Sequence, residues 1–187
     1  MNFLILDLEL NQPTQSIIQI GAVVGNLESG EVLEQLSVYV RPYPEETISD
    51  FIVKLTGIDN ALIDERGAHL TQGFKSVLDL HSRHRCFKNV VTWGGNDAQL
   101  LINQTQAKDS SINPLVFGYR WIDLKTAFQM YQFSNNRASR GGLKGALRSV
   151  GLSFKGRQHD ALDDAYNTWL MMLRLKALFE ESVSRKI

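Results

Sequence analysis

Two acidic side chains interrupt the apolar run that opens the sequence, MNFLILDLEL. Successive side chains of a β-strand alternate between its faces, so Asp7 and Glu9 point to the same side. The run is apolar on both faces, which is typical of a central, buried strand. Two like charges there repel each other and lose hydration, and a bound divalent cation would remove both costs. Acids at a strand end are also often simply solvated, so both interpretations stay open at this point.

A third acid occupies an unexpected position in the helix predicted near the C-terminus. On a helical wheel Asp163 falls on the polar face with Asn167, whereas Asp164 falls between Met171 and Leu175. A carboxylate against an apolar core needs a partner, which makes Asp164 a candidate functional residue. The alternative is an ordinary acid that the helix dipole favours near the N-terminus.

Two further residues can join this set only through particular local structures. His159 lies roughly 140° from Asp164 on the same wheel, so it can share a site only from a loop that folds back before the helix. The glycines of segment 151–156 supply such a lead-in. Asp97 follows a β-branched run and a double glycine, which places it near a helix start beside a strand end. A simple helix N-cap is the alternative for Asp97.

The elements that must position these residues follow from hydrophobic periodicity and turn signals. Strands are predicted over Phe3–Leu10, Ser16–Val24, Glu31–Val40, Lys88–Trp93 and Trp121–Asp123. Helices are predicted over Ile48–Leu55, Asn60–Glu65, Thr71–Arg83 and Asp97–Gln106, then up to Tyr131, and over Gly142–Val150 and Asp160–Glu181. Strands first, and then strands alternating with helices, predict an α/β fold with a mixed sheet flanked by helices.

Composition excludes several classes of protein. The chain has 187 residues, 43% of them hydrophobic, with 20 basic and 20 acidic residues, so it is neither a strongly basic duplex-coating protein nor an acidic disordered tail. No apolar stretch of about 18 residues predicts a membrane span. Acids in the first apolar run do not suit a signal peptide, and the single Cys86 excludes a disulfide framework. We therefore expect one cytoplasmic domain over residues 1–187, without a membrane partner; protein partners and oligomeric state are not indicated.

Three motifs stand in the order of a known family: Asp7-Leu8-Glu9, the stretch from Trp93 to Asp97, and His159 to Asp164. On these motifs the chain resembles the DEDDh 3′–5′ exonucleases, over nearly its full length. DLELN is close to the pattern D-x-E-x-[TN], and the last motif satisfies H-x-A-x-x-D. IIQIGAV matches the second-strand pattern I-x-E-I-G-A, with Gln19 in place of the usual Glu, and LTGI at 55–58 matches the stretch that lines the terminal-nucleotide pocket. The motif style is nearest to the ERI-type exoribonucleases.

The resemblance implies an RNase H-like fold, with a five-stranded sheet in which an antiparallel meander is followed by parallel strands. It also implies a metal-dependent 3′–5′ exonuclease that hydrolyses single-stranded nucleic acid, RNA and/or DNA, from the 3′ end to 5′-mononucleotides. Two Mg²⁺ (or Mn²⁺) ions would be held by the carboxylates of Asp7, Glu9, Asp97 and Asp164. Glu9 and His159 would be the catalytic residues, with His159 as general base, since an ordinary histidine pKa near 6.5 suits that task.

Contacts to the 3′ end of the substrate are implied for Leu8, Leu10, Asn11, Leu55, Thr56, Ile58 and Trp93. Trp93 could stack on a base or belong to the core, and Asp123 is expected to be structural. A phosphate-contacting rim is suggested by the basic residues Arg137, Arg140, Lys144, Arg148, Lys155 and Arg157. The alternatives are a catalytically silent nucleic-acid-binding or regulatory module, and a polymerase-associated proofreading subunit. All five positions of the acid and histidine set are filled, which favours an active enzyme.

Overall fold

The structure is a computed structural model that describes residues 1–42, 46–138 and 141–184, except for the side chain of residue 183. Its strands form one five-stranded sheet in the order β3-β2-β1-β4-β5. They are β1 (Asn2–Leu10), β2 (Ile17–Asn26), β3 (Val32–Tyr39), β4 (Val91–Thr92) and β5 (Ile122–Asp123). The first three strands pair antiparallel, and β1, β4 and β5 run parallel. The predicted mixed five-stranded α/β fold is confirmed.

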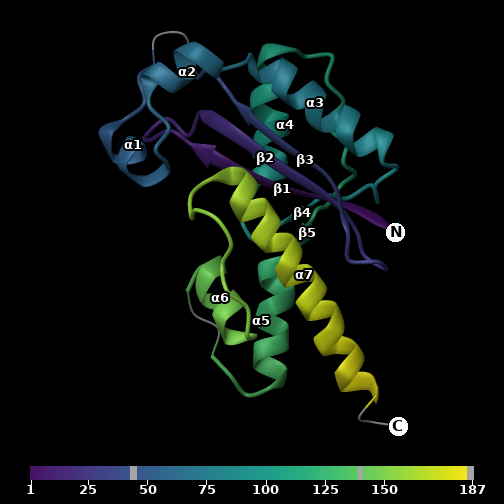
Figure 1. Cartoon of the computed structure of the whole chain (residues 1–187). Coiled ribbons are helices and arrows are strands. Elements are labelled where there is room, and N and C mark those ends of the chain that lie inside the picture. Colours follow the sequence, from purple (N-terminus) through teal and green to yellow (C-terminus); the bar gives the residue numbers. More distant parts are fainter. Residues whose placement is uncertain (43–45, 139–140, 185–187) are drawn as a thin grey trace.

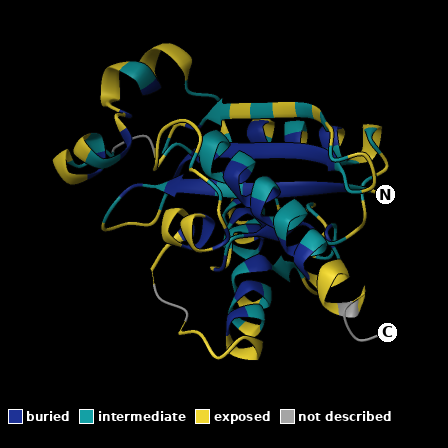
Figure 2. Cartoon of the chain, turned by 60° about the horizontal axis from the view of Figure 1, so that its bottom comes forward, coloured by how far each residue is buried: buried dark blue, intermediate teal, exposed yellow. Residues whose placement is uncertain are grey.

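Helices cover both faces of this sheet (Figure 1). They are α1 (Asp50–Thr56), α2 (Asn60–Arg66), α3 (Leu70–Arg83), α4 (Asp97–Lys108), α5 (Leu124–Ser134), α6 (Leu143–Ser149) and α7 (Ala161–Ser184). Leu4, Leu6 and Leu8 of β1 pack with α3 and α4, whereas Phe3 and Ile5 pack with α5, α6 and α7. Figure 2 shows β1 and β2 buried between these layers. The central position predicted for the first strand is therefore correct.

The fourth strand is shorter than predicted. The strand covers Val91–Thr92, against the expected range of residues 88–93. Gly94 and Gly95 both have positive φ values, 69° and 63°, so the chain turns out of the sheet directly after Trp93. At the other end, the Asn89 side-chain amide donates to the Phe117 carbonyl, 3.1 Å away, and holds the incoming chain in a bend. The short strand delivers the start of α4 to the edge where β1 ends.

Two glycines of β2 let α7 lie very close to the sheet. A Cβ atom on Gly21 would sit 2.0 Å from the main-chain carbon of Ala161, the first residue of α7. A Cβ atom on Gly25 would sit 2.4 Å from the Trp169 ring. In the β1–β2 register Gly21 is directly opposite Asp7, so this approach brings the N-terminus of α7 beside the acid pair of β1.

A third apolar cluster fixes α1 and α2 at the end of the sheet. Its buried members are Ile18 of β2 together with Ile48, Ile52, Ile58 and Ile63. In Figure 1 α1, the end of β1 and the N-terminus of α7 lie on the same side of the molecule. Within the described ranges, no helix is long and apolar enough to cross a membrane. The cytoplasmic location stays a prediction.

Candidate active site

Asp7 and Glu9 lie on the face of β1 that is covered by α7. They share the side of Phe3 and Ile5, both of which belong to the α7 cluster, as strand alternation predicted. Glu9 is only 8% exposed and stands opposite Gln19 in the β1–β2 register. The pair is therefore held inside the fold rather than solvated at a loop mouth.

Asp164 and His159 reach the same place from the start of α7. Asp164 lies in the first turn, and its Oδ2 atom accepts a hydrogen bond of 3.1 Å from the His159 main-chain N–H. His159 has a φ of 61°, in the left-handed region, so the chain folds back before the helix as the wheel predicted. Ligand atoms of Glu9, His159 and Asp164 all lie within 4.8 Å of one another. Glu9, near the start of the chain, thus converges with two residues from the start of α7.

Asp97 is the first residue of α4 and does not act as the N-cap. The capping position belongs to Asn96, whose side chain makes no capping hydrogen bond. The carboxylate of Asp97 instead lies close enough to Asp7 to raise the pKa of Asp7. The N-cap interpretation of Asp97 is therefore wrong, because the two glycines before Asn96 turn the chain one residue earlier than a simple cap would require.

Burial raises the pKa of every acid in this group, and repulsion from other members of the group raises the pKa of Asp7 and Glu9 further. Desolvation is the largest cause throughout; it raises the pKa of Glu9 to about 8, of Asp97 to about 7 and of Asp164 to about 6. The pKa of Asp7 is also raised well above its ordinary range, by burial and then by Asp97, Asp164 and Glu9. The positive charge of Arg157 lowers the pKa of Glu9, but it does not offset the other contributions.

This arrangement fits a divalent cation. Four converging carboxylates, from Asp7, Glu9, Asp97 and Asp164, provide the oxygen ligands that Mg²⁺ and Mn²⁺ prefer. Without a cation, the raised pKa values show that the fold holds these groups at an electrostatic cost. A bound divalent ion would remove that cost by supplying positive charge where the acids converge.

The L-T-G-I stretch forms the C-terminal end of α1 and the turn after it. The Thr56 hydroxyl donates to the Ile52 carbonyl, 2.9 Å away, and accepts from the Ile58 main-chain N–H at 3.1 Å. Thr56 and Ile58 are each 3% exposed, so they support the turn from inside. Leu55 is half-buried. Of the three predicted contact residues, Leu55 has the side-chain surface that a substrate can touch.

Asn11 and the neighbouring leucines also lie mostly inside the fold. Asn11 is 1% exposed; its Oδ1 atom accepts from the Ser49 main-chain N–H at 3.0 Å, and its Nδ2 atom donates to the Thr47 carbonyl at 2.9 Å. It therefore ties the end of β1 to the start of α1. Leu8 is buried on the α3 and α4 side of the sheet, and Leu10 is half-buried against the same cluster. Leu10 remains the residue of this group with exposed surface.

Trp93 is occupied by core contacts. Its ring lies 5.8 Å from that of Phe128, centroid to centroid, and it packs against the α5–α7 cluster. Its Nε1 atom is buried without a hydrogen-bond partner among the described residues. The structure therefore favours the core alternative for Trp93 over base stacking.

Asp123 caps α5, since its Oδ1 atom accepts from the main-chain N–H groups of Thr126 at 3.2 Å and of Gly94 at 3.0 Å. These contacts agree with the structural role expected for Asp123.

The loop before α7 carries a basic residue, Arg157, whose charge acts on the acids. The main-chain N–H of Arg157 donates to Asp163 Oδ2 at 2.7 Å, and its guanidinium reaches the Leu55 carbonyl at 3.4 Å. Lys144 of α6 donates to the Gln158 side chain at 3.0 Å. Arg157 therefore links this loop to the end of α1, beside the acid cluster. Arg140 of the predicted rim lies outside the described residues.

Three features of this region were missed by sequence reasoning. Asn167, expected on the polar face, is fully buried, because its side chain bonds to both main-chain polar groups of Lys155 across the loop. Gln19 is also fully buried and bonds to Asp160. Phe51 on α1 is 65% exposed, one helical turn before Leu55. The sequence signals for Gln19 were its polarity within an apolar strand and its place in the second-strand pattern, where it replaces the usual Glu.

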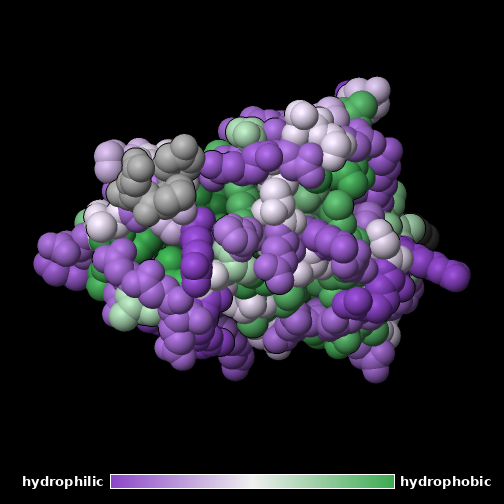
Figure 3. All heavy atoms as spheres, turned by 90° about the horizontal axis from the view of Figure 1, so that it is seen from above, coloured by the Kyte–Doolittle hydropathy of each residue, from purple (hydrophilic) through white to green (hydrophobic). Residues whose placement is uncertain are grey.

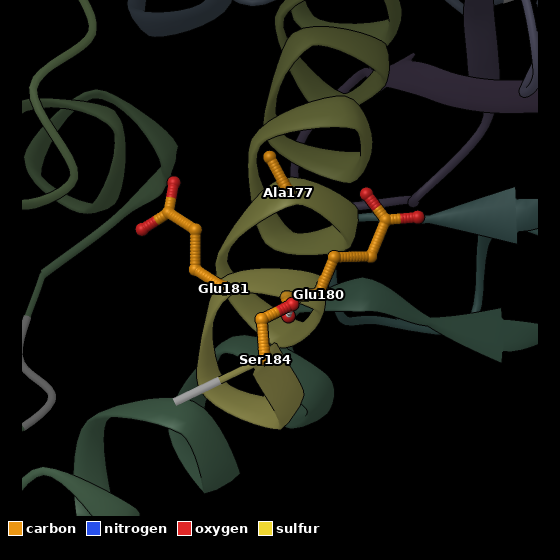
Figure 4. Close-up of a pocket in the computed structure, with 4 residues that line it drawn as sticks. All are labelled: Ala177, Glu180, Glu181 and Ser184. Atoms are coloured by element: carbon orange, nitrogen blue, oxygen red, sulfur yellow. Dashed lines mark hydrogen bonds between the residues drawn. The ribbon is translucent and has the colours of Figure 1, made fainter. Parts of the chain in front are cut away.

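One pocket elsewhere among the described residues does not resemble a catalytic site. A pocket at the far end of α7 is lined by two glutamates, a serine and an alanine, and the glutamates point to opposite sides of the helix (Figure 4). Each glutamate pairs with a basic residue of α7: Glu180 with Lys176 at 2.8 Å and Glu181 with Arg174 at 3.6 Å. Seen from above, hydrophilic residues cover most of the surface, with apolar patches between them (Figure 3).

Comparison with known proteins decides the family. A model of the exonuclease family (RNase_T) matches residues 4–172. The chain belongs to the exonuclease family. It is 28% identical to ERI1 exoribonuclease 2 of Homo sapiens, over 87% of this chain and 25% of that protein. It is 27% identical to 3′-5′ exoribonuclease 1 of Homo sapiens, over 85% of this chain and 46% of that protein. The chain thus spans between a quarter and a half of the length of these relatives.

A solved structure agrees with this assignment at the level of the fold. The nuclease domain of 3′hExo, described as a DEDDh family member bound to rAMP, superposes with a TM-score of 0.79 at 23% identity. The match covers 94% of this chain and 92% of that one. The RNase H-like exonuclease fold expected from the motifs is therefore confirmed, and so is the resemblance to DEDDh nucleases.

Proposed function

We propose that residues 1–187 form a single exonuclease domain that hydrolyses single-stranded RNA from its 3′ end to 5′-mononucleotides. The observation that carries the proposal is the convergence of Asp7, Glu9, Asp97 and Asp164, with the His159 ring within 4.8 Å of the Glu9 and Asp164 carboxylates. Membership of the exonuclease family supports the reaction class. The exoribonuclease names of the two relatives favour RNA over DNA as the preferred substrate.

The four carboxylates would hold two Mg²⁺ or Mn²⁺ ions. Asp7, central on β1, would contact both ions; Glu9 and Asp164 would hold the ion beside His159, and Asp97 would hold the other. When bound, such ions neutralise charge at the phosphate and favour ionisation of a nearby water molecule. β1 is buried, and Gly21 of the neighbouring β2 lets α7 pack closely over this face, which keeps the carboxylates in place before substrate arrives.

His159 is placed to remove a proton from the attacking water. Its main-chain N–H is held by Asp164, while the residue itself stays exposed, so the ring can face both the acids and an incoming strand. Water then attacks the phosphorus of the last phosphodiester and its proton passes to the imidazole. The bond from phosphorus to the 3′-oxygen of the preceding nucleotide breaks, and that oxygen takes a proton from solvent to become the new 3′-hydroxyl. A general base of this kind contributes roughly 10²- to 10⁴-fold to the rate.

The end of α1 is the best-placed surface for the terminal nucleotide. Leu55 and Leu10 offer half-buried apolar surface, and the exposed ring of Phe51 stands one turn from Leu55. Aromatic stacking on a base is worth about 1–3 kcal/mol in single-strand binders. The Arg157 guanidinium beside Leu55 supplies positive charge for a phosphate. We therefore assign the terminal base to α1 and its phosphate to the loop before α7.

A digestion panel tests this proposal. The purified chain, supplied with Mg²⁺ or Mn²⁺, is given 5′-labelled single- and double-stranded RNA and DNA. We expect a ladder that shortens from the 3′ end, faster on single-stranded RNA, and no ladder with EDTA. Asp7→Asn should be inactive, whereas the matched control Asp79→Asn, on the exposed side of α3, should be fully active.

The same panel separates the alternatives. Equal digestion of an oligonucleotide blocked at its 3′ end would indicate an endonuclease. Activity that survives EDTA would contradict the cation site. No activity on any substrate, with binding retained, would favour the silent binding module.

A further inference from the structure

A polar pair, of which Gln19 is buried and Asp160 half-buried, links β2 to the start of α7 next to the acids. Gln19 is fully buried in the middle of an apolar strand and stands opposite Glu9 in the register. Asp160 lies immediately before α7, between His159 and the first helical residue. The two side chains meet across 141 residues of sequence, where Gln19 Nε2 donates to Asp160 Oδ2 at 3.1 Å. Neither residue belongs to the proposed cation ligands.

The contacts of Gln19 require an amide. Its Oε1 atom accepts from the Ala161 main-chain N–H at 3.0 Å, which fixes the orientation of the side chain, since a main-chain N–H can only donate. Its Nε2 atom then faces Asp160 and also donates to the Ser37 hydroxyl at 3.1 Å. A buried group that uses both its donor and its acceptor in this way cannot be replaced by a carboxylate without losing one of them.

Together the two side chains accept hydrogen bonds from the first three main-chain N–H groups of α7. Asp160 Oδ1 accepts from the main-chain N–H groups of Leu162 at 3.0 Å and Asp163 at 3.2 Å, while Gln19 accepts from that of Ala161. These are groups that a helix leaves unsatisfied at its N-terminus. The pair therefore fixes where the first turn of α7 begins and how the helix is rotated about its axis.

That starting point determines where the catalytic groups lie. Asp164 follows within the first turn, and its carboxylate in turn holds the backbone of His159. Gly21 leaves no space between the strand and Ala161, so α7 cannot move closer to compensate for a lost contact. A shift of the helix start would therefore move Asp164 and His159 relative to Glu9.

We propose that Gln19 and Asp160 are a positioning pair, which sets Asp164 and His159 against Glu9 for cation binding and catalysis. The inference rests on the proposed function for its catalytic part alone. It predicts that the identities of the two residues are coupled: one member must donate and the other must accept. A carboxylate at position 19 is then tolerated only with an amide at position 160.

The test uses three variants of the full chain: Gln19→Glu, Asp160→Asn and the double variant. In Gln19→Glu two carboxylates face each other beside Glu9. In the double variant the amide introduced at position 160 donates to the carboxylate introduced at position 19, so the bond is restored with reversed direction and the net charge equals that of the wild type. Gln35→Glu, at an exposed position of β3, is the matched control for the added charge.

Mn²⁺ affinity is measured by calorimetry at pH 8, together with thermal unfolding and kcat/KM. Gln19→Glu should lose about 10- to 100-fold in both Mn²⁺ affinity and kcat/KM, as outer-shell substitutions typically do. The double variant should recover both to within about threefold of the wild type, because coupled neighbours are non-additive. Recovery in the double variant supports the pair even if Gln19→Glu alone does not fold.

Three results would overturn the inference. Tighter Mn²⁺ binding by Gln19→Glu would mean that position 19 acts only through its charge. Unchanged affinity in that variant would mean that the contacts do not position the ligands. A double variant no better than Gln19→Glu would disprove the coupling. If the wild type degrades no nucleic acid while the affinities follow the predicted order, the proposed function fails and the positioning pair stands.

Discussion

The metal-free protein should be less stable at pH 8 than at pH 5, and Glu9 should cause much of the difference. The pKa of Glu9 is about 8 in the folded protein, against an ordinary value of 4.5. Between these two values the folded state holds a proton that the unfolded state has lost. The free energy of unfolding therefore falls as the pH rises between these two pKa values.

The size of the effect follows from the two pKa values. At pH 8 the raised pKa of Glu9 lowers the free energy of unfolding by about 4 kcal/mol. At pH 5 it lowers the free energy of unfolding by about 1 kcal/mol. Glu9 is 8% exposed, so solvent screening does not reduce this strongly. The wild type should thus lose about 3 kcal/mol of stability from this group between pH 5 and pH 8. For a chain of this length that corresponds to a Tm lower by about 6–12 °C.

Thermal unfolding in EDTA at both pH values measures this loss. Glu9→Gln should remove about 3 kcal/mol of the pH dependence and make the metal-free protein more stable at pH 8. Glu65→Gln, which removes an exposed carboxylate from α2, is the matched control and should leave the pH dependence unchanged. Added Mn²⁺ should raise the Tm of the wild type more at pH 8 than at pH 5, because the acids bind a cation only after losing their protons.

Equal Tm values for the metal-free wild type at the two pH values would refute this reasoning. So would a Glu9→Gln variant that keeps the full pH dependence. Either result would mean that the carboxylate is well hydrated or already paired, and the electrostatic argument for a cation site would be lost.

Three more outcomes are expected. His159→Ala should lower kcat by roughly 10²- to 10⁴-fold with little change in Tm, and a rate near the wild type in single-turnover assays would exclude a general base at this position. Gly21→Ala should destabilise the fold by about 3 kcal/mol or more and weaken Mn²⁺ binding, since the added methyl group would overlap Ala161; a wild-type melting curve would contradict the close approach. Asp123→Ala should cost about 1 kcal/mol by denaturant titration through its lost cap, and a variant that binds less Mn²⁺ at equal stability would instead make Asp123 part of the site.

Much of the site was predictable because its signals are local. Alternation along a strand placed Asp7 and Glu9 on one face, and the helical wheel separated Asp164 from Asp163. The wheel also required His159 to fold back, and its left-handed φ of 61° makes that turn. These inferences need nothing beyond the periods of regular secondary structure, which the order of neighbouring residues determines.

The errors occurred where contacts or turns outside the regular periods decide the position of a side chain. Asn167 was assigned to the polar face, but the loop that holds Lys155 covers it and uses its amide. Trp93 was a candidate for base stacking, but Phe128 of α5 lies against its ring. The capping role weighed for Asp97 depended on where the helix begins, which the turn at Gly94 and Gly95 decides.

The sequence by itself determined the class of the fold, the acids on the central strand and the family, because each is written in local pattern and motif. Only the tertiary structure decided how those groups are held together. Gly21 can let α7 approach β2 only when the two pack, and the bond between Gln19 and Asp160 joins residues 141 positions apart. The pKa of Glu9 likewise depends on burial and on acids from other elements. Such contacts form between distant parts of the chain, so no local period encodes them.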